Sequence, residues 1–201
     1  MSSVEARGRG RPREFDVEQA LEKAIDVFRQ RGYDGTSMTD LLDGMALSRG
    51  SLYKAFKDKR SVFLAAYDRY TSINQERLQQ AIEQADSGRA RVLAVLNTYA
   101  VRASDENGRM GCLVVATAIN LTTVDPEIAS RVSASVDRLK KLLMRLLTEG
   151  KADGSVNAHI DERATAELIL CLVQGMRILG KTSPHRAVMN RVVAEAMKLL
   201  D

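Results

Sequence analysis

Residues 32–59, GYDGTSMTDLLDGMALSRGSLYKAFKDK, decide the fold. The stretch begins with a Gly-Tyr-Asp-Gly turn, and Ser37 follows as a helix N-cap with Asp40 three residues later. A short apolar stripe runs from Met38 to Met45, and Ser48 is the N-cap candidate of a second short helix. Two short helices joined by a tight turn have the geometry of a helix-turn-helix.

Amphipathic helices are predicted on both sides of this motif. Before it, apolar residues from Val17 to Phe28 recur with a helical period, and Gly32 ends the pattern. After it, a long helix begins near Val62 and fades near Gly88. Further helices are predicted over 92–106, 112–121, 125–150, 161–180 and 184–200, with Asn107-Gly108 as a stop and Ser183-Pro184 as the last start. The run 112–121 also fits a strand, but its alanines favour a helix. The sequence thus predicts an all-α fold of about nine helices and no convincing strand.

Length and composition exclude several classes of protein. The 201 residues are 45% hydrophobic and 28% charged, which fits one domain, or one domain with a small appendage, around a packed core. No apolar run approaches the ~18–20 residues of a membrane span. The first 14 residues hold four arginines and no apolar segment, so they do not form a secretory signal. We expect a cytoplasmic protein that does not associate with a membrane.

Side chains that support catalysis or metal binding are few. Cys112 and Cys171 belong to no CxxC pair, and His159 and His185 do not stand at a zinc-ligand spacing from them. The sequence also contains no nucleophile elbow, P-loop, HExxH or Rossmann pattern. We therefore predict no enzyme, no cofactor, no metal site and no disulfide framework.

Positive charge is concentrated in two segments near the start of the chain. Residues 7–13 carry four arginines and no acid, and residues 49–60 carry five basic residues against Asp58 alone, although the net charge is only +4. Charge gathered in this way indicates a polyanionic partner.

The second short helix carries side chains of the types that read DNA. Arg, Lys and hydroxyl groups bind base edges in the major groove, which admits an α-helix. Gly50 lets the helix backbone approach the sugar-phosphate chain closely, and the side chains that point away from the apolar side are Arg49, Ser51, Tyr53 and Lys54. In the arm, Arg9 and Arg11 flank a Gly and precede a Pro, a composition that fits the minor groove. A solvated surface helix and a solvated arm are the alternatives.

The residues around this motif form a recognisable set. Gly32-Tyr33, TSMTDL at 36–41, LSRGSLY at 47–53, Phe56 and Lys59 occur in register over about residues 15–70. Together they resemble the N-terminal signature of the TetR family of bacterial transcriptional regulators. The family has Gly in the turn where this chain has Ala46, from which we expect a slightly different turn geometry.

The resemblance implies an organisation and a set of DNA contacts. It implies a basic arm at 1–14, a helix-turn-helix domain at 15–75, and an effector-binding and dimerisation domain at 76–201. It places phosphates near Thr36, Ser37 and Thr39 and against Lys59. It implies base or backbone contacts from Arg49, Ser51, Tyr53 and Lys54.

Two apolar stripes on one helix predict a dimer interface. Within 161–180, one stripe is Leu168, Cys171, Leu172, Gly175 and Leu179, and another lies on the opposite side. The last helix also carries two stripes. A helix that is apolar on both sides must be covered on both, and a chain of this size has little left for the second cover. We predict a homodimer, with the interface residues Ile169, Val173, Gly175, Met176, Gly180, Val188, Val192 and Leu199. A wholly internal helical pair is the alternative.

A ligand pocket is predicted from composition alone, in the part of the chain where TetR-like proteins bind effectors. Its candidate residues are Tyr67, Tyr70, Tyr99, Met110, Cys112, Val115, Ala118 and Ile119. Gly111-Cys112-Leu113 also resembles a stretch in one branch of the family, some of whose members sense electrophiles or oxidants through cysteine. The thiolate of Cys112 would be favoured at a helix N-terminus, whereas a small packing residue is the alternative.

These observations lead to one functional hypothesis and its competitors. The sequence predicts a dimeric, ligand-responsive repressor that binds a palindromic double-stranded DNA operator and is released by a small-molecule effector. An activator or a cysteine-operated redox regulator is the alternative within the class. A helical ligand-binding or carrier protein without operator recognition is the alternative from another class.

Overall fold

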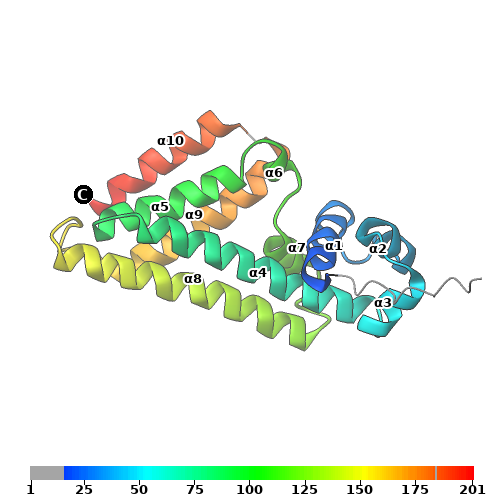
Figure 1. Ribbon diagram of the computed structural model, residues 1–201. Coiled ribbons are helices and arrows are strands. Elements are labelled where there is room, and N and C mark those ends of the chain that lie inside the picture. Colours follow the sequence, from blue (N-terminus) through cyan, green and yellow to red (C-terminus); the bar gives the residue numbers. More distant parts are fainter. Residues whose placement is uncertain (1–15, 184) are drawn as a thin grey trace, which may run out of the picture.

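A computed structural model describes residues 16–183 and 185–201 (Figure 1). Over these residues the chain is all-α, as predicted, with ten α-helices and a closing 3₁₀ turn. The helices are α1 (Val17–Arg31), α2 (Met38–Met45), α3 (Arg49–Ala55), α4 (Lys59–Glu83), α5 (Gly88–Arg102), α6 (Asp105–Arg109), α7 (Leu113–Asn120), α8 (Pro126–Ala152), α9 (Glu162–Thr182) and α10 (Arg186–Ala196), followed by the 3₁₀ turn Met197–Leu200.

Two of the predicted helix boundaries are corrected by the structure. The helix expected to stop at Asn107-Gly108 ends at Arg102, because Asp105 takes a left-handed φ of 55° and starts the separate helix α6. This short helix contains Asn107 and Gly108 and accounts for the tenth helix. The last helix begins at Arg186 after the N-cap His185, and the Pro184 expected to start it lies outside the described residues.

The helix-turn-helix forms where residues 32–59 predict it. Ser37 caps α2 by accepting from the backbone N–H of Asp40 at 3.1 Å, and the Asp40 carboxylate accepts from the backbone N–H of Ser37 at 2.8 Å. Ser48 caps α3 by accepting from Ser51 N–H at 3.1 Å. These reciprocal bonds satisfy donors that a helix start leaves open, so the two helix starts follow from local sequence.

The turn between α2 and α3 has the geometry that glycine usually adopts. Ala46 lies at φ 56° and ψ 43°, and the Leu47 N–H donates to the Leu42 carbonyl at 3.0 Å. This is a Schellman C-cap, in which the left-handed residue is normally Gly. The expectation of a different turn geometry at Ala46 is therefore wrong.

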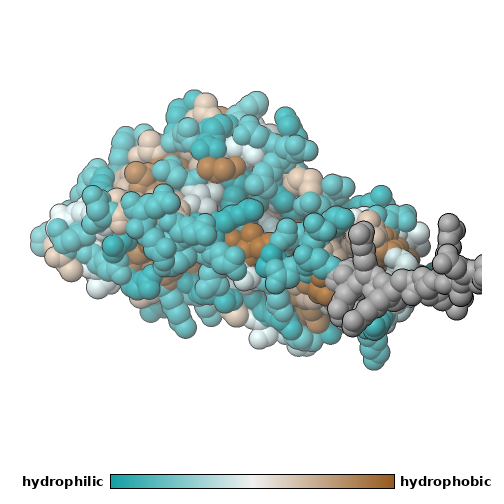
Figure 2. Space-filling view, viewed as in Figure 1, coloured by the Kyte–Doolittle hydropathy of each residue, from teal (hydrophilic) through white to brown (hydrophobic). Residues whose placement is uncertain are grey.

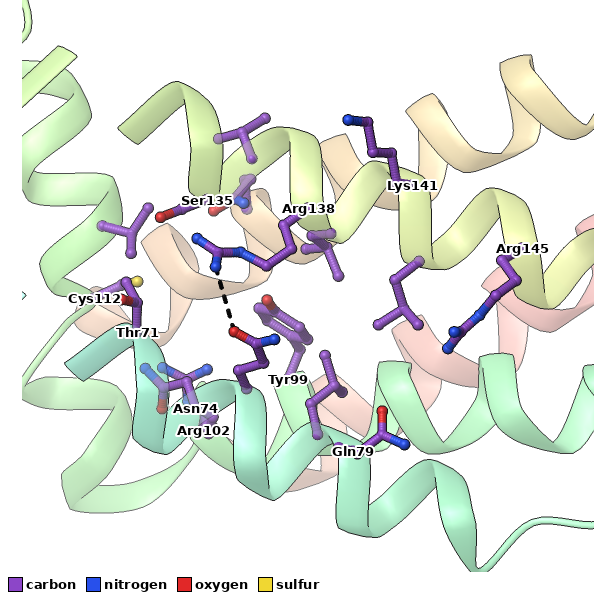
Figure 3. Close-up of a pocket in the computed structure, with 17 residues that line it drawn as sticks. Thr71, Asn74, Gln79, Tyr99, Arg102, Cys112, Ser135, Arg138, Lys141 and Arg145 are labelled. Atoms are coloured by element: carbon purple, nitrogen blue, oxygen red, sulfur yellow. Dashed lines mark hydrogen bonds between the residues drawn. The ribbon is translucent and has the colours of Figure 1, made fainter. Parts of the chain in front are cut away.

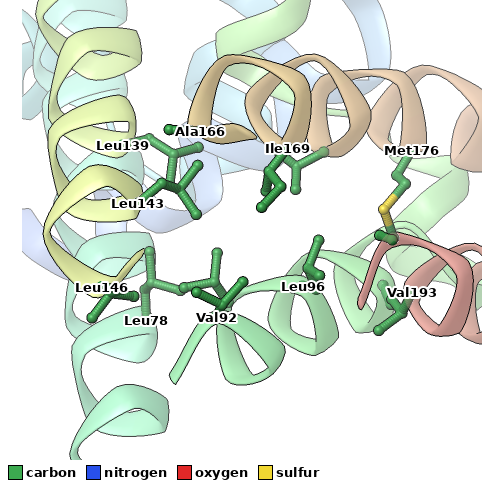
Figure 4. Close-up of a cluster of buried hydrophobic side chains, with 14 of the residues drawn as sticks. Leu78, Val92, Leu96, Leu139, Leu143, Leu146, Ala166, Ile169, Met176 and Val193 are labelled. Carbon is green, nitrogen blue, oxygen red and sulfur yellow. The ribbon is translucent and has the colours of Figure 1, made fainter. Parts of the chain in front are cut away.

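Helix α4 runs from the helix-turn-helix into the rest of the molecule (Figure 1). Its first half packs with α1–α3 in one hydrophobic core, which includes Phe28, Leu52 and Phe63. Its second half joins another core with α5, α8, α9 and α10 (Figure 4). The change between the cores falls between Tyr70 and Leu78. Helix α7 and the start of α8 belong to the first core, so C-terminal elements pack directly against the DNA-binding part.

The two faces of α9 are the reverse of the predicted arrangement. Ile169, Val173, Met176 and Gly180 are buried within the protomer, and Figure 4 shows Ile169 and Met176 pointing into the core. A Cβ added at Gly180 would lie 2.3 Å from the Ala103 carbonyl oxygen, so this glycine lets α9 approach the end of α5. These four residues therefore do not form the surface that we predicted for a partner.

The exposed apolar face of α9 is the other stripe. Leu168 and Leu179 are 52% and 53% exposed, and Cys171 is exposed between them. Gly175 is half-exposed on the same side. On α10, Val188 and Val192 are also half-exposed, and Leu199 of the closing 3₁₀ turn is 37% exposed. The side of the molecule in Figure 2 is mainly hydrophilic with separate apolar patches. Among the described helices, none combines the length and apolar character that crossing a bilayer requires.

Candidate DNA-binding surface and ligand cavity

Helix α3 presents the predicted reading residues to solvent. Arg49, Gly50 and Lys54 are exposed, and Tyr53 is 47% exposed, while Leu52 on the opposite side is fully buried. Ser51 is half-buried, and its hydroxyl accepts from the Ser48 hydroxyl at 2.9 Å. The N-terminus of α2, the helix before α3 in the chain, presents Ser37 and Thr39, and both are exposed. Free backbone N–H groups at such a terminus suit a phosphate.

Gly50 has no internal reason to be glycine. A Cβ built at this position would meet only the Ser48 Oγ at 4.0 Å, which is an ordinary contact. By contrast, a Cβ at Gly44 would lie 2.3 Å from a Val27 methyl carbon, so Gly44 is required where α2 packs on α1. The packing of the protomer therefore does not require glycine at position 50.

Two predicted phosphate contacts have internal roles. Thr36 is 1% exposed, and its hydroxyl donates to the Gly32 carbonyl at 2.6 Å. A phosphate oxygen needs a donor, and this hydroxyl already donates within the protomer, so the Thr36 side chain is not free for the contact that the resemblance implies. Lys59 Nζ donates to the Tyr33 carbonyl at 2.9 Å and lies 4.3 Å from the centre of the Tyr33 ring. An ammonium has three N–H donors, so Lys59 stabilises the turn and keeps donors for a phosphate. Arg9 and Arg11 lie outside the described residues.

A cavity of about 400 Å³ lies between α4, α5, α7, α8 and α9 (Figure 3). Of the predicted ligand residues, Tyr99 and Cys112 line it. Tyr67 and Tyr70 are buried behind its wall, and Met110, Val115, Ala118 and Ile119 are not part of it. The cavity lining comprises Thr71, Asn74, Gln75, Leu78, Gln79, Tyr99, Arg102, Cys112, Val114, Ser135, Val136, Arg138, Leu139, Lys141, Leu142, Arg145 and Gln174.

Sequence reasoning missed the charged residues of this cavity. Arg138, Lys141 and Arg145 follow one another at spacings of three and four along α8, so they share one helix face. Arg102 ends an otherwise apolar stretch of α5. The spacing was visible in the sequence, but a row of cations on a helix is usually a solvated face. Only the packing of α8 over α4 and α5 makes it the wall of a cavity.

The inner end of the cavity contains a hydrogen-bonded group of aromatic, thiol and guanidinium side chains. Arg102 Nη2 donates to the Tyr70 hydroxyl at 2.8 Å, and that hydroxyl donates to Cys112 Sγ at 3.7 Å. The Arg102 guanidinium lies 5.6 Å from the centre of the Tyr99 ring. Burial raises the pKa of Tyr99 to about 12, so its phenol stays neutral near pH 7. The arrangement surrounds Cys112 with donors and positive charge.

Burial and charge act in opposite directions on the Cys112 thiol. Burial, the largest influence, raises its pKa, whereas the positive charges of Arg177 and Arg102 lower it. Hydrogen bonds from the Val115 N–H and the Tyr70 hydroxyl also lower it, and the net direction is downward. A lowered pKa favours the thiolate, the reactive form of cysteine.

The carbonyl of Gly111 links the cavity to the helix-turn-helix. Arg29 of α1 donates to this oxygen from Nε at 3.1 Å and from Nη2 at 2.9 Å, and Arg177 of α9 donates from Nη2 at 2.9 Å. Gly111 has a φ of 77°, a conformation that favours glycine. It directly precedes the cavity-lining Cys112, so one peptide connects the cavity to arginines of α1 and α9.

A second connection joins the base of α4 to α8. Arg60 Nε donates to Asp125 Oδ2 at 2.7 Å, and its Nη2 donates to Glu127 Oε2 at 2.6 Å. Arg60 is one of the five basic residues of the segment 49–60, and its guanidinium is engaged in this pair of interactions. Within the described residues, no group of three or more His, Cys, Asp or Glu is arranged to hold a metal ion.

Comparison with known proteins agrees with both parts of this architecture. Residues 20–66 match the family model "Bacterial regulatory proteins, tetR family", and residues 88–196 match "Tetracyclin repressor-like, C-terminal domain". The transcriptional repressor ComR of Escherichia coli is 26% identical over 198 residues, covering 96% of this chain and 92% of its own length.

Solved structures resemble the whole chain. A cysteine mutant of the TetR family regulator CifR, complexed with a 26 bp double-strand operator, is 30% identical with a TM-score of 0.82, covering 94% of this chain and 98% of its own. A TetR regulator from Chloroflexus aurantiacus has a TM-score of 0.81 at 23% identity, covering 90% of this chain and 91% of its own. Fold and surface together define a helix-turn-helix transcriptional regulator. The chain belongs to the TetR family of bacterial regulatory proteins.

Proposed function

We propose that the protein is a homodimeric repressor that binds a palindromic operator through α3 and releases it when a small effector enters the cavity. The exposed, cationic face of α3 carries the proposal, because its Gly50 and Lys54 make no contact that the protomer needs. The operator complex of CifR, which is 30% identical, supports operator binding by this chain. A two-fold dimer would place its reading helices about one DNA turn apart, ~34–36 Å, or a multiple of this distance.

The dimer interface is proposed on the exposed stripe of α9 together with α10. Its apolar residues have no cover from the described part of the protomer, as the exposures of Leu168 and Leu179 show. Gly175 lies at the middle of this stripe, and a Cβ built there meets nothing within 4 Å. A glycine with open space around it fits a close approach by a second copy of the helix.

Effector release follows from connections between the cavity and α1. An effector that displaces α7 would move the Gly111 carbonyl, to which Arg29 of α1 donates. Helix α4 also lines the cavity and begins beside α3. A ligand shifts the equilibrium only as far as it prefers the state that does not bind DNA. We place the protein in the cytoplasm and assign it no enzymatic activity.

The first experiment is to find the operator. Genomic fragments bound by the purified protein are sequenced, and the recovered site is then used in titrations beside a random duplex.

Replacing Tyr53 or Lys54 by Ala should weaken binding to the operator by about 1–3 kcal/mol and binding to the random duplex much less, since base contacts carry the sequence information. Lys198→Ala, which changes an exposed lysine of the closing 3₁₀ turn that pairs with Glu195, is the matched control. Equal losses on both duplexes would remove Tyr53 and Lys54 from the reading role.

A cysteine-operated release is the second candidate. Cys112 lines the cavity, and Arg177 and Arg102 lower its thiol pKa against the effect of burial. Alkylation of Cys112 by a small electrophile should therefore release operator DNA from the wild type and leave Cys112→Ser bound. Release of both proteins alike, or of neither, would make Cys112 a packing residue.

A further inference from the structure

The charges that line the cavity are all of one sign. Arg102, Arg138, Lys141 and Arg145 are the ionised side chains of its wall, and no carboxylate of the described residues lines it. The rest of the lining is apolar or neutral and includes Leu78, Leu139 and Leu142. A pocket that combines cationic and apolar side chains in its wall is complementary to an amphipathic anion.

Arg102 is the cation whose position is most constrained. It is 9% exposed, and its one hydrogen bond among the described residues is from Nη2 to the neutral Tyr70 hydroxyl at 2.8 Å. It has stacked contacts with the rings of Tyr70 and Tyr99, 5.5 and 5.6 Å from their centres. A buried guanidinium without a carboxylate is costly unless an anion compensates its charge.

Two neighbouring arginines add to this excess of charge. Arg177 is 1% exposed, and its Nε and Nη1 are buried without a hydrogen-bond partner among the described residues. Arg29 has one carboxylate nearby, Asp26, at 3.6 Å. Glu22, in the smaller hollow on the other side of Arg102, is bound by Arg69 at 2.6 Å. The carboxylates that the structure describes in this region are therefore already engaged, and Cys112 is the ionisable group left to oppose Arg102 and Arg177.

The cavity wall also carries exposed cations on α8. Arg138 contacts Gln75 across the cavity at 3.5 Å, the dashed line in Figure 3. Arg145 is 3.6 Å from Glu149 within α8, and Arg138 and Lys141 form no ion pair with the described residues. Exposed cations at an entrance attract anions over roughly a Debye length, whereas the buried Arg102 can anchor one.

We propose that the effector is an organic anion with an apolar body, held by its carboxylate or phosphate at Arg102. The apolar body would lie along Leu78, Leu139 and Leu142, and the cations of α8 would guide it in. The planar guanidinium binds either head group through paired N–H donors. This inference deepens the proposed function, because it assigns the chemical class of the effector to the same cavity.

Calorimetric titration of the DNA-free protein tests the proposal directly. The probes are straight-chain carboxylates of six to twelve carbons, 2-naphthoate and octyl phosphate, each beside its neutral amide or alcohol. At least one anion should bind at least about tenfold more tightly than its neutral partner, the size of one charge-assisted hydrogen bond. Comparing the affinities of the carboxylates with that of octyl phosphate shows which head group the site prefers. Failure of every anion to bind, or equal binding of the neutral partners, would overturn the proposal.

Variants assign the binding to Arg102. Arg102→Met should lower affinity for the best anion at least about tenfold, and Arg102→Lys should retain part of it. Arg91→Met is the control, because Arg91 is on the same helix and pairs with Glu149 outside the cavity. Thermal melting checks that each variant folds. Unchanged affinity in folded Arg102→Met would disprove the anchor.

A cysteine variant separates an anion site from a thiol contact. Cys112→Ser should bind the anion at least as tightly as the wild type, because it removes a competing negative charge. Weaker binding would assign the interaction to the thiol and contradict the proposal. All these titrations contain no DNA. Anion binding with no operator recognition would leave the inference standing while the repressor assignment fails.

Discussion

At Ala46 a methyl group occupies a left-handed backbone conformation that is normally left to glycine. Its φ of 56° completes the C-cap of α2 and sets the angle at which α3 leaves. Gly32, which ends α1, has a φ of 72° and ψ of 175°, a region that is essentially closed to side chains. Helices α1 and α2 thus both end at a residue with positive φ. Of these two residues only Ala46 has a side chain, so the backbone strain falls there.

Exchanging glycine and alanine at these two positions should have opposite effects. Ala46→Gly should raise the free energy of unfolding by about 0.5–1 kcal/mol, since relief of left-handed strain exceeds the entropy cost of glycine. Gly32→Ala should lower it by about 1–3 kcal/mol. An added Cβ at Gly32 meets nothing within 4 Å, so the loss reports backbone strain alone. Urea denaturation measures both, and destabilisation by Ala46→Gly would contradict the strain at this turn.

At the scale of elements, the Arg60–Asp125 pair ties the first turn of α4 to the first turn of α8. Asp125 is also the N-cap of α8, so its carboxylate accepts from Ile128 N–H as well as from Arg60. The hydrogen bonds from Arg60 and from the helix N-terminus lower the pKa of Asp125 to about 2. A carboxylate with a depressed pKa stabilises the folded state above its unfolded pKa, and this stabilisation is lost as pH falls.

Acid unfolding should therefore depend on Asp125. Between about pH 4 and pH 2 the wild type loses the contribution of this carboxylate, whereas Asp125→Asn has already lost it. The variant should be less stable at pH 7, and its stability should fall less steeply over that interval. Asp161→Asn makes the same change at the N-cap of α9, where no arginine from another described element is bonded. Equal slopes in Asp125→Asn and the wild type, measured by denaturation at each pH, would refute the linkage.

At the scale of the whole molecule, the proposed dimer interface on the exposed stripe of α9 can be tested by one substitution. Gly175→Glu should convert the dimer to a monomer, because it buries an unpaired carboxylate where two copies of α9 approach. The protomer has room for the side chain, so its thermal melting should show a folded chain. Ala134→Glu adds the same charge on an exposed face of α8 and should leave the dimer intact. Analytical ultracentrifugation reads the mass, and a dimeric Gly175→Glu variant would place the interface elsewhere.

Most helix positions, the caps of α2 and α3 and the helix-turn-helix could be predicted from the sequence. They follow from interactions within a few residues, such as the Ser37–Asp40 capping box and the period of apolar residues in α1. The outward direction of Arg49, Tyr53 and Lys54 also follows, because a short amphipathic helix has only one apolar side to bury. The internal roles of Thr36 and Lys59 did not follow, because each depends on a carbonyl of the turn after α1, at Gly32 and Tyr33.

What the sequence by itself determined is therefore most of the elements and the family to which they belong, while the tertiary structure decided which faces pack together. The two stripes of α9 have the same period and similar apolar character, so periodicity could not rank them. The close approach at Gly180 against Ala103 turned Ile169 and Met176 inward and left Leu168 and Leu179 outside. The cavity, too, exists only where α5, with Arg102, and α8, with Arg138 and Lys141, line the same space. Contacts between residues this distant in the chain are set by packing, which no local pattern records.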